Sequence, residues 1–146
     1  MIYDTSIKNK EIIRKMNLEL GKAYSFFKSI KIGGTGSSKM LVEQCSHDMK
    51  QFLSKFQGAN YASIELRPKG IIVHLKRNNT THHSWAIPFH RLVIYNTEHF
   101  TIYEGGSYIR FNRSTFHLNN SKFISKLLDL KAKYWTDFKP EEELVF

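Results

Sequence analysis

Four basic side chains stand in turns that the sequence predicts at one end of a sheet. Arg67 and Lys69 lie in a predicted turn at residues 67–70, and His90 and Arg91 lie in another at residues 90–91. Because antiparallel strands alternate in direction, these turns and the turn at residues 105–106 fall at the same end. Basic side chains gathered at one place can hold a phosphate through charge-assisted hydrogen bonds. The sequence therefore predicts an anion-binding site at Arg67, Lys69, His90 and Arg91. The alternative is a set of unrelated turn charges.

A second group of side chains has the composition of a base-stacking surface. Tyr103, Tyr108 and Arg110 fall on the outer face of the last predicted hairpin, and Arg113 follows it. Aromatic side chains interleaved with basic ones can stack nucleic-acid bases on a sheet. The same residues also form ordinary cross-strand pairs. We favour that interpretation because the glycine-containing RNA-recognition consensus is absent, and we keep nucleic-acid binding as an alternative.

The other reactive residue types predict neither a metal centre nor a catalytic site. His82 and His83 are neighbours in a predicted loop, and the chain contains no His-x-x-x-His or Cys-x-x-Cys spacing. Cys45 falls on an apolar stripe, which is typical of a buried small hydrophobe. The glycine-rich residues 33–38 lack the spacing of a phosphate-binding loop and follow a predicted helix instead of a strand. We therefore expect no metal, no cofactor and no enzymatic activity.

Composition and charge fit one folded domain with an anionic or acidic partner. The chain has 146 residues, of which 41% are hydrophobic and 14% aromatic, and this content argues against disorder. Its net charge is +9: residues 1–57 hold 10 Lys and Arg against 5 Asp and Glu, residues 58–120 hold 7 against 3, and residues 121–146 hold 5 against 5. Such a surplus suits nucleic acid, anionic lipid or an acidic protein, and the alternative is a solvated basic surface that binds no specific ligand. No apolar run approaches the length of a membrane span and no signal core stands at the N-terminus, so we expect a soluble, cytoplasmic protein.

Two amphipathic helices are predicted before the strands begin. Apolar residues recur at steps of three or four over residues 6–31, after N-cap candidates at residues 4–6. The glycine-rich segment interrupts this period, which resumes after Ser37 or Ser38 and stops at Gly58. A short link between two amphipathic helices predicts an antiparallel pair. We therefore expect a helical hairpin over residues 1–58.

From Tyr61 onward the apolar residues alternate, which predicts six antiparallel strands. The strands at residues 61–66 and 71–76 pair around the turn at residues 67–70, and the strands at residues 100–103 and 108–111 pair around Gly105-Gly106. Between these hairpins we expect a strand at residues 85–89 and another at residues 91–96. In the first hairpin, Ile64 faces Val73 on the core face and Ser63 faces His74 on the outer face. Between the strands at residues 71–76 and 85–89, we expect Leu75 near Trp85, Val73 near Ile87, and Ile71 near Phe89.

The chain closes with a predicted amphipathic helix and an acidic tail. Asn120 or Ser121 can cap this helix, whose apolar stripe runs to Phe138 and must dock on the sheet. Three glutamates mark residues 139–146 as the tail. The predicted fold class is thus α+β: an N-terminal helical hairpin, then an antiparallel curled sheet or open barrel over residues 59–138 that ends in the C-terminal helix.

The order of these elements resembles the pleckstrin-homology-like family, including its bacterial members. The segments GIIVHLK, SWAIPFHRLVIY and FTIYEGGSYIRF look like the family's recurring strands and hairpin, and Trp135 resembles the tryptophan of its last helix. The resemblance covers residues 60–138. It implies seven strands where we count six, and it implies that the end carrying Arg67 and Arg91 meets the membrane in lipid-binding relatives.

Taken together, the sequence predicts a non-catalytic binding or adaptor module. We expect it to recognise a protein partner through the open sheet edge or the basic helices. Peripheral binding of an anionic lipid headgroup or inositol phosphate is one alternative, and binding of nucleic acid is another. Association with a second copy of the chain is also open.

Overall fold

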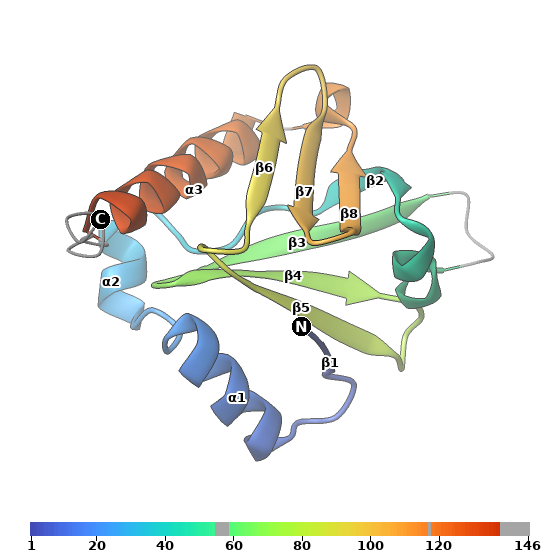
Figure 1. Cartoon of the computed structure of the whole chain (residues 1–146), viewed down its shortest axis with the longest axis horizontal. Coiled ribbons are helices and arrows are strands. Elements are labelled where there is room, and N and C mark those ends of the chain that lie inside the picture. The colour runs from blue at the N-terminus through green and yellow to red at the C-terminus, as the bar shows by residue number, and fades with distance from the viewer. Residues whose placement is uncertain (55–58, 117, 138–146) are drawn as a thin grey trace, which may run out of the picture.

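The computed structural model describes residues 1–54, 59–116 and 118–137 of the chain. It is an α+β fold with an eight-stranded antiparallel open sheet and a C-terminal helix (Figure 1). The strands are β1 (Ile2–Asp4), β2 (Met40–Cys45), β3 (Asn60–Arg67), β4 (Gly70–Lys76), β5 (His82–Pro88), β6 (Val93–Asn96), β7 (Phe100–Glu104) and β8 (Ser107–Phe111). The helices are α1 (Lys10–Leu20), α2 (Phe26–Lys31) and α3 (Leu118–Asp137), and 3₁₀ turns lie at His47–Phe52 and Arg113–Thr115.

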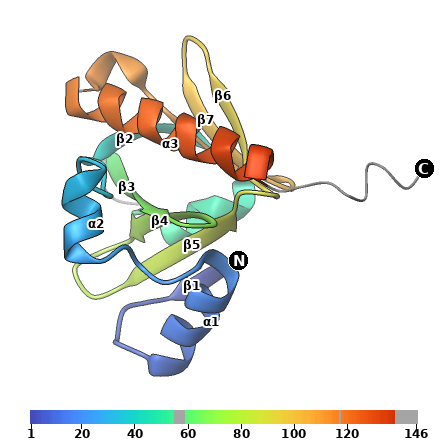
Figure 2. The ribbon, with the colours of Figure 1, turned by 90° about the vertical axis from the view of Figure 1, so that its left-hand side faces the viewer.

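Strand β2 joins two halves of the sheet, whose order is β1-β5-β4-β3-β2-β8-β7-β6. It pairs with β3 on one side and with β8 on the other, with a register shift between Val42 and Gln44. The sheet curls around a core that includes Trp85, Phe100 and Phe111. Figure 2 shows α3 lying across the opening between the β3–β5 half and the β6–β8 half. Its buried side chains there, Phe123, Ile124 and Leu127, complete the core.

Both predicted hairpins are confirmed residue by residue. In β3 and β4, Ile64 pairs with Val73 and Ser63 with His74. In β7 and β8, Ile102 pairs with Ile109 and Tyr103 with Tyr108. These turns are short and each strand has one apolar face, so a slip by one residue would expose every apolar side chain. The predicted C-terminal helix is also confirmed, as α3, although Phe138 and the acidic tail at residues 139–146 lie outside the described residues.

The predicted register of β5 is wrong by two residues. Val73 pairs with Trp85 and Leu75 with His83, whereas the prediction set Leu75 near Trp85. The reason is a shorter connection than predicted: the Arg77 N–H donates to the Thr81 carbonyl at 3.0 Å, so β5 begins directly after a tight loop. A shift of two residues leaves the same side chains on the core face, and the apolar pattern alone could not detect it.

The predicted first helix is two helices. Helix α1 begins after Asn9, whose side chain caps it, and ends at Gly21, which has φ of 81°. That left-handed conformation stops the helix. Pro68 would lie 3.2 Å from a Cβ added at Gly21, so the β3–β4 turn packs against the same point. A separate helix, α2, starts after the Ser25 cap.

The predicted second helix is also wrong, and with it the helical hairpin. Residues 40–45 form β2, and the 3₁₀ turn His47–Phe52 follows. The spacing of Leu41, Cys45 and Met49 fits a helical stripe, but pairing with β3 and β8 places residues 40–45 in the sheet and overrides that local preference. Cys45, expected to be buried, is half-buried. The sheet thus gains β1 and β2 and has eight strands instead of six.

Helix α1 covers one end of the sheet face that points away from the core. Its Met16 and Leu20 pack with Tyr3, Ile72 and Ala86 in a small second apolar cluster. This cluster lies at the end of β3–β5 nearest the β3–β4 turn, where the Lys69 N–H donates to the Leu20 carbonyl at 2.9 Å. Among residues 1–54, 59–116 and 118–137, no helix covers the rest of that outer face.

Candidate binding groove on the outer face of the sheet

The structure brings the predicted basic turns together. The Phe89 N–H donates to the Lys69 carbonyl at 2.8 Å, so the turn after β3 and the turn after β5 lie side by side. Arg91 reaches Glu104, at the end of β7, with 3.6 Å between Nε and Oε2. Lys69 and His90 are exposed. The turns that carry Lys69, His90 and Arg91 therefore lie together at one end of the sheet, as predicted.

Arg67 does not face solvent as an anion ligand should. It is buried, and its Nε donates to Glu65 Oε2 at 2.6 Å. Its Nη1 donates to Asn17 Oδ1 at 3.1 Å and to the Gly21 carbonyl at 3.0 Å. The guanidinium thus clamps the end of β3 to α1. Binding of an anion by Arg67, Lys69, His90 and Arg91 stays a prediction. Of these four residues, Lys69 and His90 have exposed side chains that make no hydrogen bond or ion pair among the described residues.

Glu65 is the acidic centre of this clamp. Burial alone would raise the pKa of Glu65, but hydrogen bonds from His74 and Arg67 and the charge of Arg67 outweigh it and lower the pKa below its ordinary value. The His74 Nε2 lies 3.0 Å from Glu65 Oε1. Glu65 therefore stays ionised and holds His74 at the border of the uncovered outer face.

The predicted base-stacking residues contact one another and their own chain. The Tyr103 ring lies 5.3 Å from the rings of both Tyr95 and Tyr108. Arg110 Nε donates to Glu43 Oε2 at 3.0 Å. Arg113 Nη1 donates to Asn96 Oδ1 at 2.7 Å and to the Thr97 carbonyl at 2.9 Å. These are the contacts of the cross-strand pairing that we favoured for this face.

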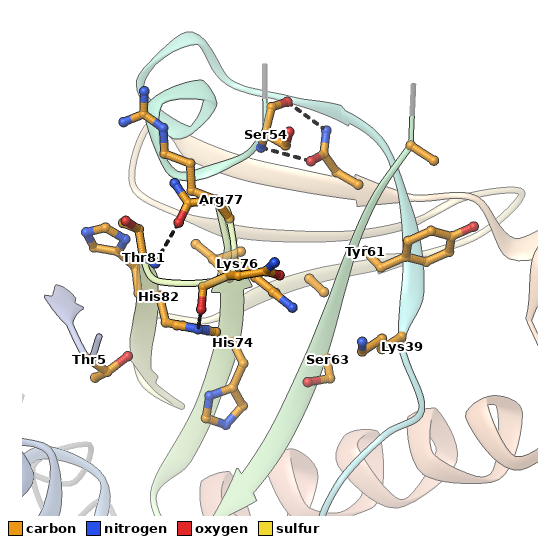
Figure 3. A pocket seen from close by; sticks show the side chains of 17 residues that line it. Thr5, Lys39, Ser54, Tyr61, Ser63, His74, Lys76, Arg77, Thr81 and His82 are labelled. Carbon is orange, nitrogen blue, oxygen red and sulfur yellow. Dashed lines mark hydrogen bonds between the residues drawn. The ribbon is translucent and has the colours of Figure 1, made fainter. Parts of the chain in front are cut away.

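A groove of about 840 Å³ opens on the outer face of β3–β5, at the end that α1 leaves uncovered. We call it the outer groove. Figure 3 shows Lys39, Tyr61 and Ser63 along one side of it, with His74 and Lys76 on the neighbouring strand. The loop after β4, which begins at Arg77, forms its far end, and Thr5 contributes from the segment after β1.

Strand alternation explains why these polar side chains gather there. Met40 and Ala62 are buried partners in β2 and β3, so Lys39, Tyr61 and Ser63 point to the opposite face. Ser63 pairs with His74, and Lys76 pairs with His82 on β5. Two neighbouring cross-strand rows thus supply two lysines, two histidines and a tyrosine.

The outer groove is bordered by three cations whose side chains have no ion-pair partner among the described residues. No carboxylate is among the residues that line it. The side chains of Lys39, Lys76 and Arg77 are exposed, and within the part of the chain that the structure describes they have no hydrogen-bonding or ion-pair partner. Tyr61 is 50% exposed and offers a phenolic hydroxyl beside them. This arrangement can bind carboxylate or phosphate groups by charge-assisted hydrogen bonds.

Sequence reasoning missed the outer groove although it placed two of its residues, Ser63 and His74, correctly. It set Ser63 opposite His74 on the outer face. It assigned Lys39 to a helix, however, and so could not bring Lys39 beside them. To find the groove, sequence reasoning would have had to assign residues 40–45 to a strand paired with the strand at residues 60–67.

Cys45 and the histidines show no reactive arrangement in the described residues. Burial raises the pKa of the Cys45 thiol, with smaller opposing and reinforcing effects from Lys50 and Asp48. Among residues 1–54, 59–116 and 118–137, no group of three His, Cys, Asp or Glu side chains is placed to hold a metal ion.

None of the helices described has the length and apolar character needed to cross a membrane. Comparison with known proteins finds no matching family model, no similar curated protein and no similar solved structure.

Proposed function

We propose that this protein is a non-catalytic binding module that recognises an acidic segment of a partner protein in the outer groove. The observation that carries the proposal is the set of three cations, Lys39, Lys76 and Arg77, around a groove without a carboxylate. Unpaired cations at a concave surface attract negative charge and speed the encounter with an acidic partner. A carboxylate-bearing segment would supply the missing ion pairs.

The shape of the groove favours a peptide over a lipid bilayer. A bilayer is bound by apolar side chains that protrude from a surface, with basic residues around them. The outer groove is hollow, and Tyr61 is the large aromatic side chain exposed in it. Its remaining lining includes short polar side chains such as Ser63, Thr81 and Asn79, which can hydrogen bond to a peptide backbone.

The same features disfavour nucleic acid in this groove. Single-stranded nucleic acid is held by several aromatic side chains on which successive bases stack. The outer groove offers Tyr61, whereas the rings of Tyr95, Tyr103 and Tyr108 contact one another in the other half of the sheet. The groove therefore suits a ligand that needs charge and hydrogen bonds without repeated stacking.

A pleckstrin-homology-like type of fold is part of this proposal. In its support, strands β2–β5 and β6–β8 followed by α3 make seven strands and a C-terminal helix, the number that the family has. Strand β2 bridges the two halves, and α3 closes the core between them. The fold type does not by itself fix the ligand, so the groove carries the functional argument.

The proposal is tested with a labelled oligoglutamate peptide as the probe and an oligoglutamine peptide as its neutral match. We expect the protein to bind oligoglutamate, and the triple variant Lys39→Glu, Lys76→Glu, Arg77→Glu to bind at least about tenfold more weakly, because each exposed charge pair contributes up to about 1 kcal/mol. The control is charge reversal at Lys10, Lys15 and Lys133, which are exposed on α1 and α3. It changes the net charge equally and should leave the affinity within about twofold.

Two results would overturn the proposal. One is equal affinity for oligoglutamate and oligoglutamine in the unmodified protein. The other is an oligonucleotide or an anionic vesicle that binds through the three groove cations while oligoglutamate does not. Either result would assign the groove to another class of ligand.

A further inference from the structure

Helix α2 turns an apolar face to solvent. The side chains of Phe26, Phe27 and Ile30 are 74%, 82% and 62% exposed. The rings of Phe26 and Phe27 contact each other edge to face, with 5.8 Å between their centroids. Ser29 is the half-buried residue of α2, and the other five residues of this helix are exposed. An amphipathic helix normally shows the reverse arrangement, with its apolar side against the core.

Contacts of the segments before and after α2 hold it in this orientation, and a cap stabilises its first turn. At its start, Ser25 caps the helix by accepting the Lys28 N–H at 3.2 Å. After its end, Lys126 on α3 donates to the carbonyls of Gly33 and Gly34, at 2.8 Å each. The segment before it is fixed by the hydrogen bond from Arg67 to the Gly21 carbonyl. The exposed phenylalanines are therefore presented by an anchored helix.

The surroundings of this apolar face are basic. Residues 20–42 contain four lysines and neither aspartate nor glutamate. Three of these lysines, Lys22, Lys28 and Lys31, are exposed on or next to α2. At about 100° per residue, Phe26, Ile30 and Phe27 share one side of the helix, and Lys31 and Lys28 follow round its circumference. Long lysine side chains at such a border can extend to phosphates while the apolar groups lie deeper.

We propose that α2 is a peripheral membrane anchor that docks on a bilayer containing anionic lipid. Phe26, Phe27 and Ile30 enter the boundary between headgroups and acyl chains, and the lysines bind the headgroup phosphates. Complementary charge selects a lipid surface as the occupant, since the face combines exposed aromatic groups with three lysines that form no ion pair among the described residues. The exposed Lys69 in the β3–β4 turn adds to that charge, because its backbone N–H bonds to Leu20 at the end of α1, from which the linker leads to α2.

This inference is independent of the outer groove. The groove is formed by the opposite ends of β3 and β4 from the turn that contacts Gly21, and it shares no lining residue with α2. A membrane-bound α2 therefore leaves the groove free for a protein ligand. The protein would then bring an acidic partner to a lipid surface.

Vesicle co-sedimentation tests the anchor. The unmodified protein should sediment with vesicles of phosphatidylcholine mixed with phosphatidylglycerol, and weakly or not at all with phosphatidylcholine alone. The double variant Phe26→Ala, Phe27→Ala should lower partitioning at least about tenfold, because it removes two apolar groups that the bilayer would bury. Lys28→Glu should lower it at least about fivefold, since each surface cation contributes about that factor. As a matched control, Leu18→Ala, on the exposed side of α1, should leave partitioning unchanged.

Three outcomes would overturn the inference. The first is no sedimentation of the unmodified protein with the mixed vesicles at low salt. The second is unchanged sedimentation of the Phe26→Ala, Phe27→Ala variant. The third is a dimer in vesicle-free solution that the same variant converts to monomer, which would assign the face to a second copy of the chain. Vesicle binding that is lost in the Lys39, Lys76, Arg77 triple variant but kept in the Phe26, Phe27 double variant would also overturn the inference. It would not overturn the proposed binding of oligoglutamate in the groove, which is measured separately.

Discussion

The guanidinium of Arg67 donates a hydrogen bond to the carbonyl oxygen of Gly21 at 3.0 Å. This contact joins the end of β3 to the linker between α1 and α2. The same side chain bonds to Glu65 and Asn17, so its donors face the protein and not solvent. Arg67, one of the four predicted anion ligands, therefore has a structural role: it fixes α1 and the linker that follows it to the sheet.

Removing this clamp should destabilise the fold. We expect Arg67→Ala to lower the free energy of unfolding by about 2–3 kcal/mol, because it breaks several hydrogen bonds and leaves Glu65 partly buried without its partner. Urea denaturation measures the change. Lys69→Ala, in the same turn but exposed, should change it by less than about 0.5 kcal/mol. Equal effects of the two substitutions would contradict the clamp.

Stability should depend on pH through Glu65. Its pKa is lowered in the folded protein, so it contributes stability that is fully present above the ordinary glutamate pKa of about 4.3 and is lost as pH falls through the folded value. We expect Glu65→Gln to destabilise the protein at neutral pH, and the difference from the unmodified protein to shrink as the pH falls below about 4. Thermal melts of both proteins across this range measure it. A difference that grows in acid would show that Glu65 has the opposite pKa shift.

Gly70 allows the close approach of three elements. A Cβ at this position would collide with the Ile87 carbonyl oxygen and lie 2.7 Å from Leu20 Cδ2. Gly70→Ala should therefore cost about 1–3 kcal/mol of stability, the range for overpacking. Gly106→Ala is the matched control, since a Cβ there meets nothing within 4 Å. If both substitutions leave the urea midpoint unchanged, the close packing of Gly70 against Ile87 and against Leu20 of α1 would be contradicted.

The sequence predicted the elements whose local pattern and tertiary role agree. The β3–β4 and β7–β8 hairpins are of this kind, since each has a short turn and one apolar face. Residues 40–45 are not, because the spacing of Leu41 and Cys45 satisfies a helix as well as a strand, and only pairing with β3 and β8 decides between them. The two-residue shift of β5 escaped detection because it preserves which side chains face the core.

The candidate sites followed the same division. Strand alternation found the assembly of basic turns and the outer position of His74. It could not foresee that Asn17 and Gly21 would take the donors of Arg67, because that depends on where α1 docks. It could not bring Lys39 to the outer groove either, since that requires β2 to be a strand.

Binding in the outer groove should weaken with salt. Exposed charges interact over about 10 Å at 0.1 M ionic strength and over about 3 Å at 1 M. We therefore expect the affinity for oligoglutamate to fall steeply across this range in fluorescence anisotropy titrations. An affinity that does not change with salt would point to an apolar interface elsewhere on the protein.

The most direct test of the central claim is an NMR titration of the isotope-labelled protein with oligoglutamate. We expect backbone amide shifts to concentrate at the outer groove, around Lys39, Tyr61, Ser63, Lys76 and Arg77. Shifts that concentrate instead around Lys69, His90 and Arg91, or their absence at saturating peptide, would contradict it.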